Sequence, residues 1–159
     1  MIRACPRQDE PATVGFVQTV DLERTNMETD FDPNGNSIAV IDDTRSARLF
    51  SQWTLSTAGY RVDAFEDAAQ GLDALARSHP GVVLVDLQLQ DLNGLDVISC
   101  LHGTHPRAAI IAISAFPTPE EAVQAMELGA DDYLPKPFTS DELKSAVRRA
   151  LAHHCSSRG

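Results

Sequence analysis

Residues 82–87 read VVLVDL, a run of aliphatic side chains that ends at an acid, Asp86. A nearly continuous apolar run of this length is typical of a central strand in a parallel sheet, because both faces of such a strand are covered. The runs SIAVI (37–41) and AIIAIS (109–114) have the same character. These three stretches therefore predict the centre of a parallel sheet.

Two further strand candidates are more polar, YRVDAF at 60–65 and DDYLPK at 131–136. In the first, Arg61 and Asp63 alternate with apolar residues, which predicts a strand at the edge of the sheet. Five strands that are each followed by an amphipathic stretch imply a doubly wound α/β fold, with right-handed crossovers and helices on both faces. The predicted helices cover residues 44–58, 66–78, 94–103, 118–128 and 139–154.

Several of the predicted helices carry start and stop signals. Thr44 and Thr118 stand where a side-chain oxygen caps the start of a helix, and Gly129 stands where a helix ends. Leu49 and Trp53 lie four residues apart in the helix 44–58 and share one of its faces, which favours packing in the core.

The composition of the 159 residues, 43% of them hydrophobic, favours a single domain. The formal net charge of −10 opposes direct binding to nucleic acid. The first 20 residues lack an apolar run of the length expected for a signal peptide, and no stretch approaches the roughly 20 apolar residues that a membrane helix needs. Its three cysteines have no paired spacing, so they predict neither a disulfide framework nor a zinc site. We therefore expect a cytoplasmic protein with no direct contact to membrane or nucleic acid.

The chain divides into three segments by pattern. Residues 1–35 mix charged residues with Thr, Pro and Gly, which predicts a flexible N-terminal extension, and Met27 within it is an alternative start. Residues 36–154 carry the regular pattern of strands and helices and form the predicted domain. Residues 155–159 are expected to be a short C-terminal tail, with no room for a second domain.

Polar residues follow or end four of the five strand candidates. Asp42 and Asp43 come after the first, Asp86 lies near the end of the third, Ser114 ends the fourth and Lys136 the fifth. Ligands bind at the carboxyl ends of strands in a doubly wound sheet, so we expect these side chains to converge. Three carboxylates repel one another unless a cation joins them, and Mg²⁺ prefers oxygen ligands. A magnesium site is predicted; the alternative is that the acids only cap helices or face solvent.

Asp86 is the strongest candidate, because an ionised side chain after a buried run needs partners. A carboxylate can attack a phosphoryl group and form an acyl phosphate, a reaction that depends on positioning and charge neutralisation. Lys136 offers a cation to a phosphate oxygen and Ser114 a hydroxyl, although a solvated lysine and a capping serine are plainer alternatives. The bond before Pro137 is either cis, which aims Lys136 inward, or an ordinary trans bond.

The chain resembles the receiver domains of bacterial two-component response regulators over residues 36–154. The fold of that family is flavodoxin-like, with strand order 2-1-3-4-5. The elements that carry the resemblance are VIDD (40–43), VVLVDLQLQDLNG (82–94), IIAISA (110–115) and LGADDYLPKPF (128–138).

The resemblance implies a role for each residue that matches the family motifs. Asp86 is then the phosphoacceptor and Lys136 binds the phosphate. Mg²⁺ is held by Asp42, Asp43, Asp86 and the backbone carbonyl of Gln88.

Further roles follow from the same resemblance. Ser114 and Tyr133 are expected to be the switch residues, and the bond before Pro137 to be cis. Gln88 and Phe116 occupy positions that tune the lifetime of the phosphorylated state, although Phe116 could simply pack on Tyr133.

The implied function is a phosphorylation-dependent signalling switch. Its donor is a sensor histidine kinase or a histidine phosphotransfer protein. A downstream protein is expected to bind the face formed by 118–128, 131–136 and 139–154, and a homodimer is possible. The chain is either a stand-alone receiver or part of a longer regulator. Gln90 departs from the family, which commonly has proline there, so the rigidity of the loop is expected to differ.

Other functions remain open from the sequence alone. The first alternative is a protein-interaction module that uses this fold without phosphorylation. A phosphatase for external substrates would need a second general acid, and the sequence offers no clear one after Asp86. A flavin carrier would need a phosphate-cradling loop after the first strand, where Asp42 and Asp43 stand instead. We therefore expect no enzyme, only a domain that promotes its own phosphorylation and dephosphorylation.

Overall fold

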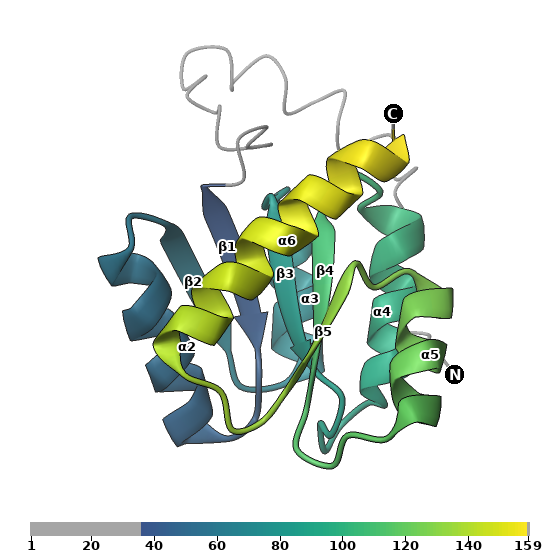
Figure 1. The fold of residues 1–159 in the computed structure, drawn as a ribbon, viewed down its shortest axis with the longest axis horizontal. Helices are drawn as coiled ribbons and strands as arrows, with labels where there is room; N and C mark the ends of the chain where they lie inside the picture. The colour runs from purple at the N-terminus through teal and green to yellow at the C-terminus, as the bar shows by residue number, and fades with distance from the viewer. Residues whose placement is uncertain (1–35, 159) are drawn as a thin grey trace.

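A computed structural model describes residues 36–158, with side-chain detail for 36–154. Five parallel strands form one sheet in the order β2-β1-β3-β4-β5 (Figure 1), which confirms the predicted doubly wound fold. The more polar strand β2 lies at an edge, as its alternation predicts. The strands are β1 (Ser37–Ile41), β2 (Arg61–Phe65), β3 (Val82–Asp86), β4 (Ala109–Ser114) and β5 (Asp132–Pro135).

Helices cover both faces of the sheet (Figure 1). On one face α2 and α6 pack over the side chains that β1, β3 and β4 direct to that side. On the other face α3, α4 and α5 pack over the alternate residues of the same strands. The helices are α2 (Arg45–Thr57), α3 (Ala68–Leu75), α4 (Gly94–Thr104), α5 (Pro119–Leu128) and α6 (Ser140–Arg158).

The strand register brings the predicted site residues to one edge. Ile41 pairs with Val85, so Asp42 and Asp86 follow as neighbours at the carboxyl ends of β1 and β3. Asp86 pairs in turn with Ile113, which sets Ser114 one position further along β4.

The expected packing of one face of α2 needs correction. Leu49 and Trp53 share a face of α2, but 47% and 67% of their surfaces are exposed. The helix instead buries the side that carries Ser51, Thr54 and Leu55.

One predicted helix boundary also differs from the structure. Helix α6 continues to Arg158, beyond the predicted end at residue 154, because neither glycine nor proline interrupts it before Gly159. The predicted extension 1–35 lies outside the described residues. In the part of the chain that the structure describes, no helix has the length and apolar character needed to cross a membrane.

Cys100, on α4, is disulfide-bonded, whereas the spacing of the cysteines predicted no disulfide framework. Sequence spacing does not show which sulfur atoms meet in a fold, and three cysteines allow one pair. The cysteines therefore give no support to a cytoplasmic location, which stays a prediction.

Candidate functional site

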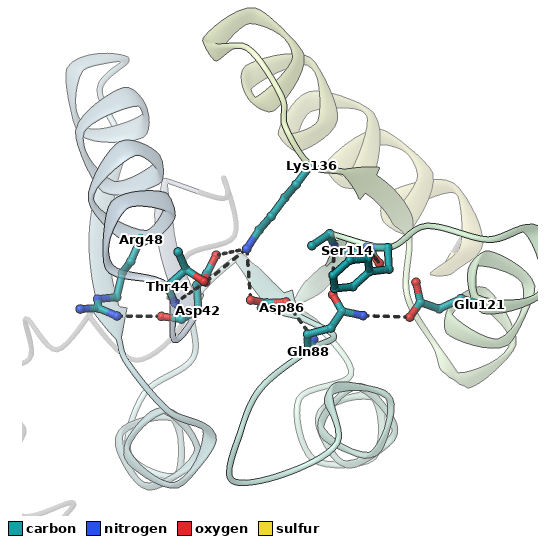
Figure 2. A network of polar contacts seen from close by, with 10 residues as sticks. Asp42, Thr44, Arg48, Asp86, Gln88, Ser114, Glu121 and Lys136 are labelled. Atoms are coloured by element: carbon teal, nitrogen blue, oxygen red, sulfur yellow. Dashed lines mark hydrogen bonds and ion pairs between the residues drawn. The ribbon is translucent and has the colours of Figure 1, made fainter.

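Two buried carboxylates and one lysine form the centre of the site. Asp42 and Asp86 expose only 1% and 2% of their surfaces. Lys136 reaches across from the end of β5, and its Nζ lies 3.2 Å from Asp42 Oδ2 and 3.2 Å from Asp86 Oδ2 (Figure 2). One ammonium group is therefore shared between two carboxylates.

Backbone groups of the following loops hold both acids in place. The N–H of Thr44 donates to Asp42 Oδ1 at 2.9 Å, and the N–H of Gln88 donates to Asp86 Oδ1 at 2.9 Å. Each carboxylate thus folds back on the chain two residues beyond itself. Arg48 on α2 donates from Nη1 to the carbonyl oxygen of Asp42 at 2.9 Å, which fixes the loop between β1 and α2.

The electrostatics of Asp42 reflect an excess of negative charge. The pKa of its carboxyl is raised from 3.8 to about 6, first by burial and then by the neighbouring Asp86. The hydrogen bond from Thr44 and the charge of Lys136 oppose this shift. An ionised Asp42 therefore lacks full compensation from the protein.

The donor set fits a hard divalent cation. One oxygen from each of Asp42, Asp43 and Asp86 lies within 4.8 Å of the others. Within the described chain, Asp42 Oδ2 is buried without a hydrogen bond, although it faces the Lys136 ammonium. Three converging carboxylates with one ammonium beside them offer the oxygen ligands that Mg²⁺ or Ca²⁺ takes from proteins.

The ends of β4 and β5 complete the edge. Ser114 is fully buried, and its Oγ accepts the N–H of Phe116 at 3.1 Å. The backbone N–H of Lys136 donates to the Ser114 carbonyl oxygen at 2.7 Å, and the Lys136–Pro137 bond is cis, as the family resemblance implied. Phe116 itself is 75% exposed, so most of its ring is uncovered by the described residues.

Tyr133 belongs to a polar contact beside the site. Its hydroxyl donates to Glu121 Oε1 at 2.7 Å. Burial and, after it, this hydrogen bond raise the pKa of the Tyr133 hydroxyl, while a hydrogen bond with Ser114 opposes the shift. The second oxygen of Glu121 accepts the side-chain amide of Gln88 at 3.2 Å.

The sequence analysis missed Glu121, Arg48 and Gly94. A Cβ atom on Gly94 would lie 2.5 Å from the Asp86 carbonyl oxygen, so only glycine lets α4 begin this close to the end of β3. Its place in QDLNG after Asp86 was a usable signal. Glu121 and Arg48 carried no signal, because charged residues on exposed helix turns are common.

Asp91 was missed as well. Its carboxylate accepts the N–H groups of Ala68 at 3.1 Å and Ala69 at 2.9 Å, at the start of α3. The contact joins residues 22 and 23 positions apart, so no local pattern could reveal it.

The fold and the site define a class: CheY-like α/β domains that carry an acid cluster and a lysine at the carboxyl edge of the sheet. The family model of the response regulator receiver domain matches residues 38–148. The chain therefore belongs to the response regulator receiver domain family of two-component systems.

Relatives support this assignment. The Escherichia coli DNA-binding transcriptional regulator NtrC is 37% identical over 115 residues, which cover 72% of this chain and 24% of that protein. The response regulator MprA of Mycobacterium tuberculosis is 37% identical over 114 residues, which cover 72% of this chain and 50% of MprA. The chain thus spans a quarter to a half of these relatives.

A solved structure also matches. It is a Burkholderia pseudomallei response regulator with a phosphorylated aspartic acid, a calcium ion and citrate, with a TM-score of 0.68 and 26% identity. The match covers 77% of this chain and 72% of that one. Receiver domains are signalling modules, and the relatives that match this chain are regulators.

Proposed function

We propose that the domain is a phosphorylation-dependent switch that accepts a phosphoryl group on Asp86 from a phosphohistidine. The observation that carries this proposal is the placement of Asp86. Its carboxylate is buried, lies 3.2 Å from the Lys136 ammonium and is close to the oxygens of Asp42 and Asp43. A nucleophile, a fixed cation and a set of metal ligands thus meet at one point.

The chemical step is one displacement at phosphorus. A carboxylate oxygen of Asp86 forms a bond to phosphorus while the bond from phosphorus to the histidine nitrogen breaks, and that nitrogen takes up a proton. Lys136 neutralises charge on the transferred group. The Ser114 hydroxyl can donate its hydrogen to a phosphoryl oxygen in exchange for its hydrogen bond with Tyr133. Hydrolysis later releases inorganic phosphate and restores the carboxylate, so the domain promotes only its own phosphorylation and dephosphorylation.

Mg²⁺ is part of the proposal. Asp42, Asp43, Asp86 and the Gln88 carbonyl would hold it, and when bound it supplies positive charge that offsets the carboxylates and the phosphoryl oxygens. The similar structure from Burkholderia pseudomallei, with its phosphorylated aspartic acid and calcium ion, supports this assignment.

The output is proposed to pass through Ser114 and Tyr133 to the face of α5, β5 and α6. A sensor histidine kinase or histidine phosphotransfer protein would be the donor, and a downstream protein or a second copy of the chain would bind this face. Two relatives are named as a DNA-binding transcriptional regulator and as a response regulator. These names favour the proposal that the chain is the receiver part of a longer regulator; a stand-alone receiver is the alternative.

The test is phosphorylation by acetyl phosphate with Mg²⁺, followed by intact mass spectrometry. The wild-type chain should gain one phosphoryl mass, and Asp86→Asn should gain none. The matched control is Asp96→Asn, an exposed acid at the start of α4, which should label like the wild type. If Asp86→Asn still gains a phosphoryl mass, Asp86 is not the phosphoacceptor. A wild type that neither labels nor binds Mg²⁺ would instead indicate an interaction module independent of phosphorylation.

A further inference from the structure

The Gln88 side chain connects three elements at the rim of the site. Its Oε1 accepts the backbone N–H of Ala115 at 3.0 Å, in the loop after β4. Its Nε2 donates to Glu121 Oε2 at 3.2 Å, in the first turn of α5 (Figure 2). Because Gln88 follows Asp86 by two residues, the loop after β3 is tied both to the next loop and to a helix.

Glu121 is the shared partner in this network. One of its oxygens accepts Gln88 and the other accepts the Tyr133 hydroxyl. Its backbone N–H donates to the Thr118 side chain, which caps α5 and fixes the first helical turn. The carboxylate also lies near the helix N-terminus, where a negative charge is favoured. Movement of Gln88 and movement of Tyr133 therefore both depend on this one carboxylate.

The contact at Ala115 matters because of where that N–H group lies. It follows Ser114 directly, and the Gln88 amide reaches it from two residues beyond Asp86. A phosphoryl group on Asp86 would bring three acceptor oxygens to this space. Lys136, the Ser114 hydroxyl and the backbone N–H groups of Gln88 and Ala115 can donate to these oxygens, and the Ala115 N–H is already engaged by Gln88 Oε1.

We propose that Glu121 is a positioning residue that holds the Gln88 amide against the Ala115 N–H and so withholds this donor from an incoming phosphoryl group. When the phosphoryl group arrives it replaces Gln88 Oε1 at Ala115, the bond from Gln88 to Glu121 breaks, and the carboxylate that also holds Tyr133 is released from one partner. The site and the Tyr133 ring are thereby coupled through a side-chain relay. This inference rests on the proposed phosphorylation of Asp86.

The kinetic test compares two neighbouring acids. Glu121→Ala removes the anchor of Gln88 and should raise the initial rate of phosphorylation by acetyl phosphate about three- to tenfold, the range expected for one net hydrogen bond. Glu120→Ala removes the same charge from the same helical turn, at an exposed residue, and should stay within about twofold of the wild type. Equal rates in the two variants would overturn the proposal that Glu121 and Gln88 withhold the Ala115 N–H from the phosphoryl group.

A spectroscopic test separates coupling from a local effect. The chain has two tyrosines, so 3-fluorotyrosine gives two ¹⁹F signals, which Tyr60→Phe assigns. In the unphosphorylated protein, Gln88→Ala should shift the Tyr133 signal, and adding Gln88→Ala to Glu121→Ala should produce no further shift. An unmoved Tyr133 signal in Gln88→Ala, or equal shifts with and without Glu121, would overturn the relay.

The outcomes also separate the two proposals. A wild type that takes no phosphoryl group would overturn the proposed function and the withheld donor together. A wild type that labels on Asp86, with no rate difference between Glu121→Ala and Glu120→Ala, would overturn this inference alone.

Discussion

At the amino edge of the sheet, His105 is buried with both ring nitrogens hydrogen-bonded, whereas at the carboxyl edge Asp42 and Asp86 are buried with one lysine between them. The His105 ring contacts the Leu75 carbonyl oxygen at 2.7 Å and Thr104 Oγ1 at 2.8 Å, and only 6% of the residue is exposed. Its polar atoms are therefore all paired within the fold.

The difference shows how one fold buries polar groups for two purposes. Paired groups at the amino edge contribute to stability, because a buried polar atom with a good partner has little desolvation penalty left. At the carboxyl edge the negative charge exceeds what Lys136 can neutralise. Burial and the neighbouring Asp86 therefore raise the pKa of Asp42, because its charged form is disfavoured. The uncompensated charge is what a divalent cation needs in order to bind.

The largest expected effect comes from removing Lys136, the only cation among the described residues that contacts the carboxylates of both Asp42 and Asp86. Lys136→Met should lower the rate of phosphorylation by acetyl phosphate about 100-fold or more, the size seen when one preorganised charge-stabilising group is lost. Lys144→Met, on α6, removes a partly exposed lysine and should leave the rate within about twofold. A rate for Lys136→Met that matches the control would show that this lysine is only structural.

The amino edge should respond in stability and not in chemistry. His105→Leu leaves the Leu75 carbonyl oxygen without its side-chain donor, so we expect a loss of about 2–3 kcal/mol in the free energy of unfolding. Urea denaturation measures this loss, and exposed His102→Leu serves as the control, within about 0.5 kcal/mol. Phosphorylation of folded His105→Leu should match the wild type, and a slowed reaction would erase the distinction between the two edges.

Asp42→Asn should raise stability while it weakens the metal site. A carboxyl whose pKa rises from 3.8 to about 6 on folding holds its proton more tightly in the native state. Its contribution to the free energy of unfolding therefore falls as the pH rises from about 4 to about 6. Without Mg²⁺, Asp42→Asn should match the wild type below about pH 4 and exceed it by roughly 2 kcal/mol at pH 7.

Thermal unfolding in EDTA across this pH range measures the difference. Asp96→Asn is the matched control, a surface substitution expected to stay within about 0.5 kcal/mol at each pH. Excess Mg²⁺ should stabilise the wild type more than Asp42→Asn, because only the intact acid cluster binds the ion well. An advantage for Asp42→Asn that does not change with pH would contradict the charge explanation.

The smallest effect is expected where Asp91, in the loop between β3 and α4, contacts the start of α3. Asp91→Ala removes the acceptor for two N–H groups at the start of that helix and should cost about 1 kcal/mol in stability. It should also weaken Mg²⁺ binding about threefold, a change that calorimetry can measure, whereas Asp67→Ala removes only the cap within α3. Equal Mg²⁺ affinity in the two variants would show that the bridge does not support the loop.

Sequence patterns were sufficient to predict the sheet and to predict which acids and which lysine lie at its carboxyl edge. Apolar runs that end in polar residues identify buried strands, and a parallel sheet aligns their carboxyl ends, so the positions of Asp42, Asp86, Ser114 and Lys136 could be predicted together. The cis bond before Pro137 came only from the family resemblance, because proline statistics favour trans.

The remaining features depend on how helices are rotated in the fold. Glu120 and Glu121 are adjacent and chemically identical, and only the orientation of α5 selects Glu121 to face Gln88 and Tyr133. In the same way, spacing places Leu49 and Trp53 on one face of α2 but cannot show that this face is exposed.

The bridge from Asp91 to α3 has a consequence for the loop that carries Gln88. Ordering a flexible backbone costs roughly 1–2 kcal/mol per residue, a cost that an ion would otherwise meet on binding. Here the loop is fastened at Asp86 through the Gln88 N–H and again at Asp91, so its entropy is already reduced before any ion arrives. The stiffness that proline would give to the loop is thus provided by an acid one position later. Residue 90 is then free to vary, and Gln90 has no need to constrain the backbone.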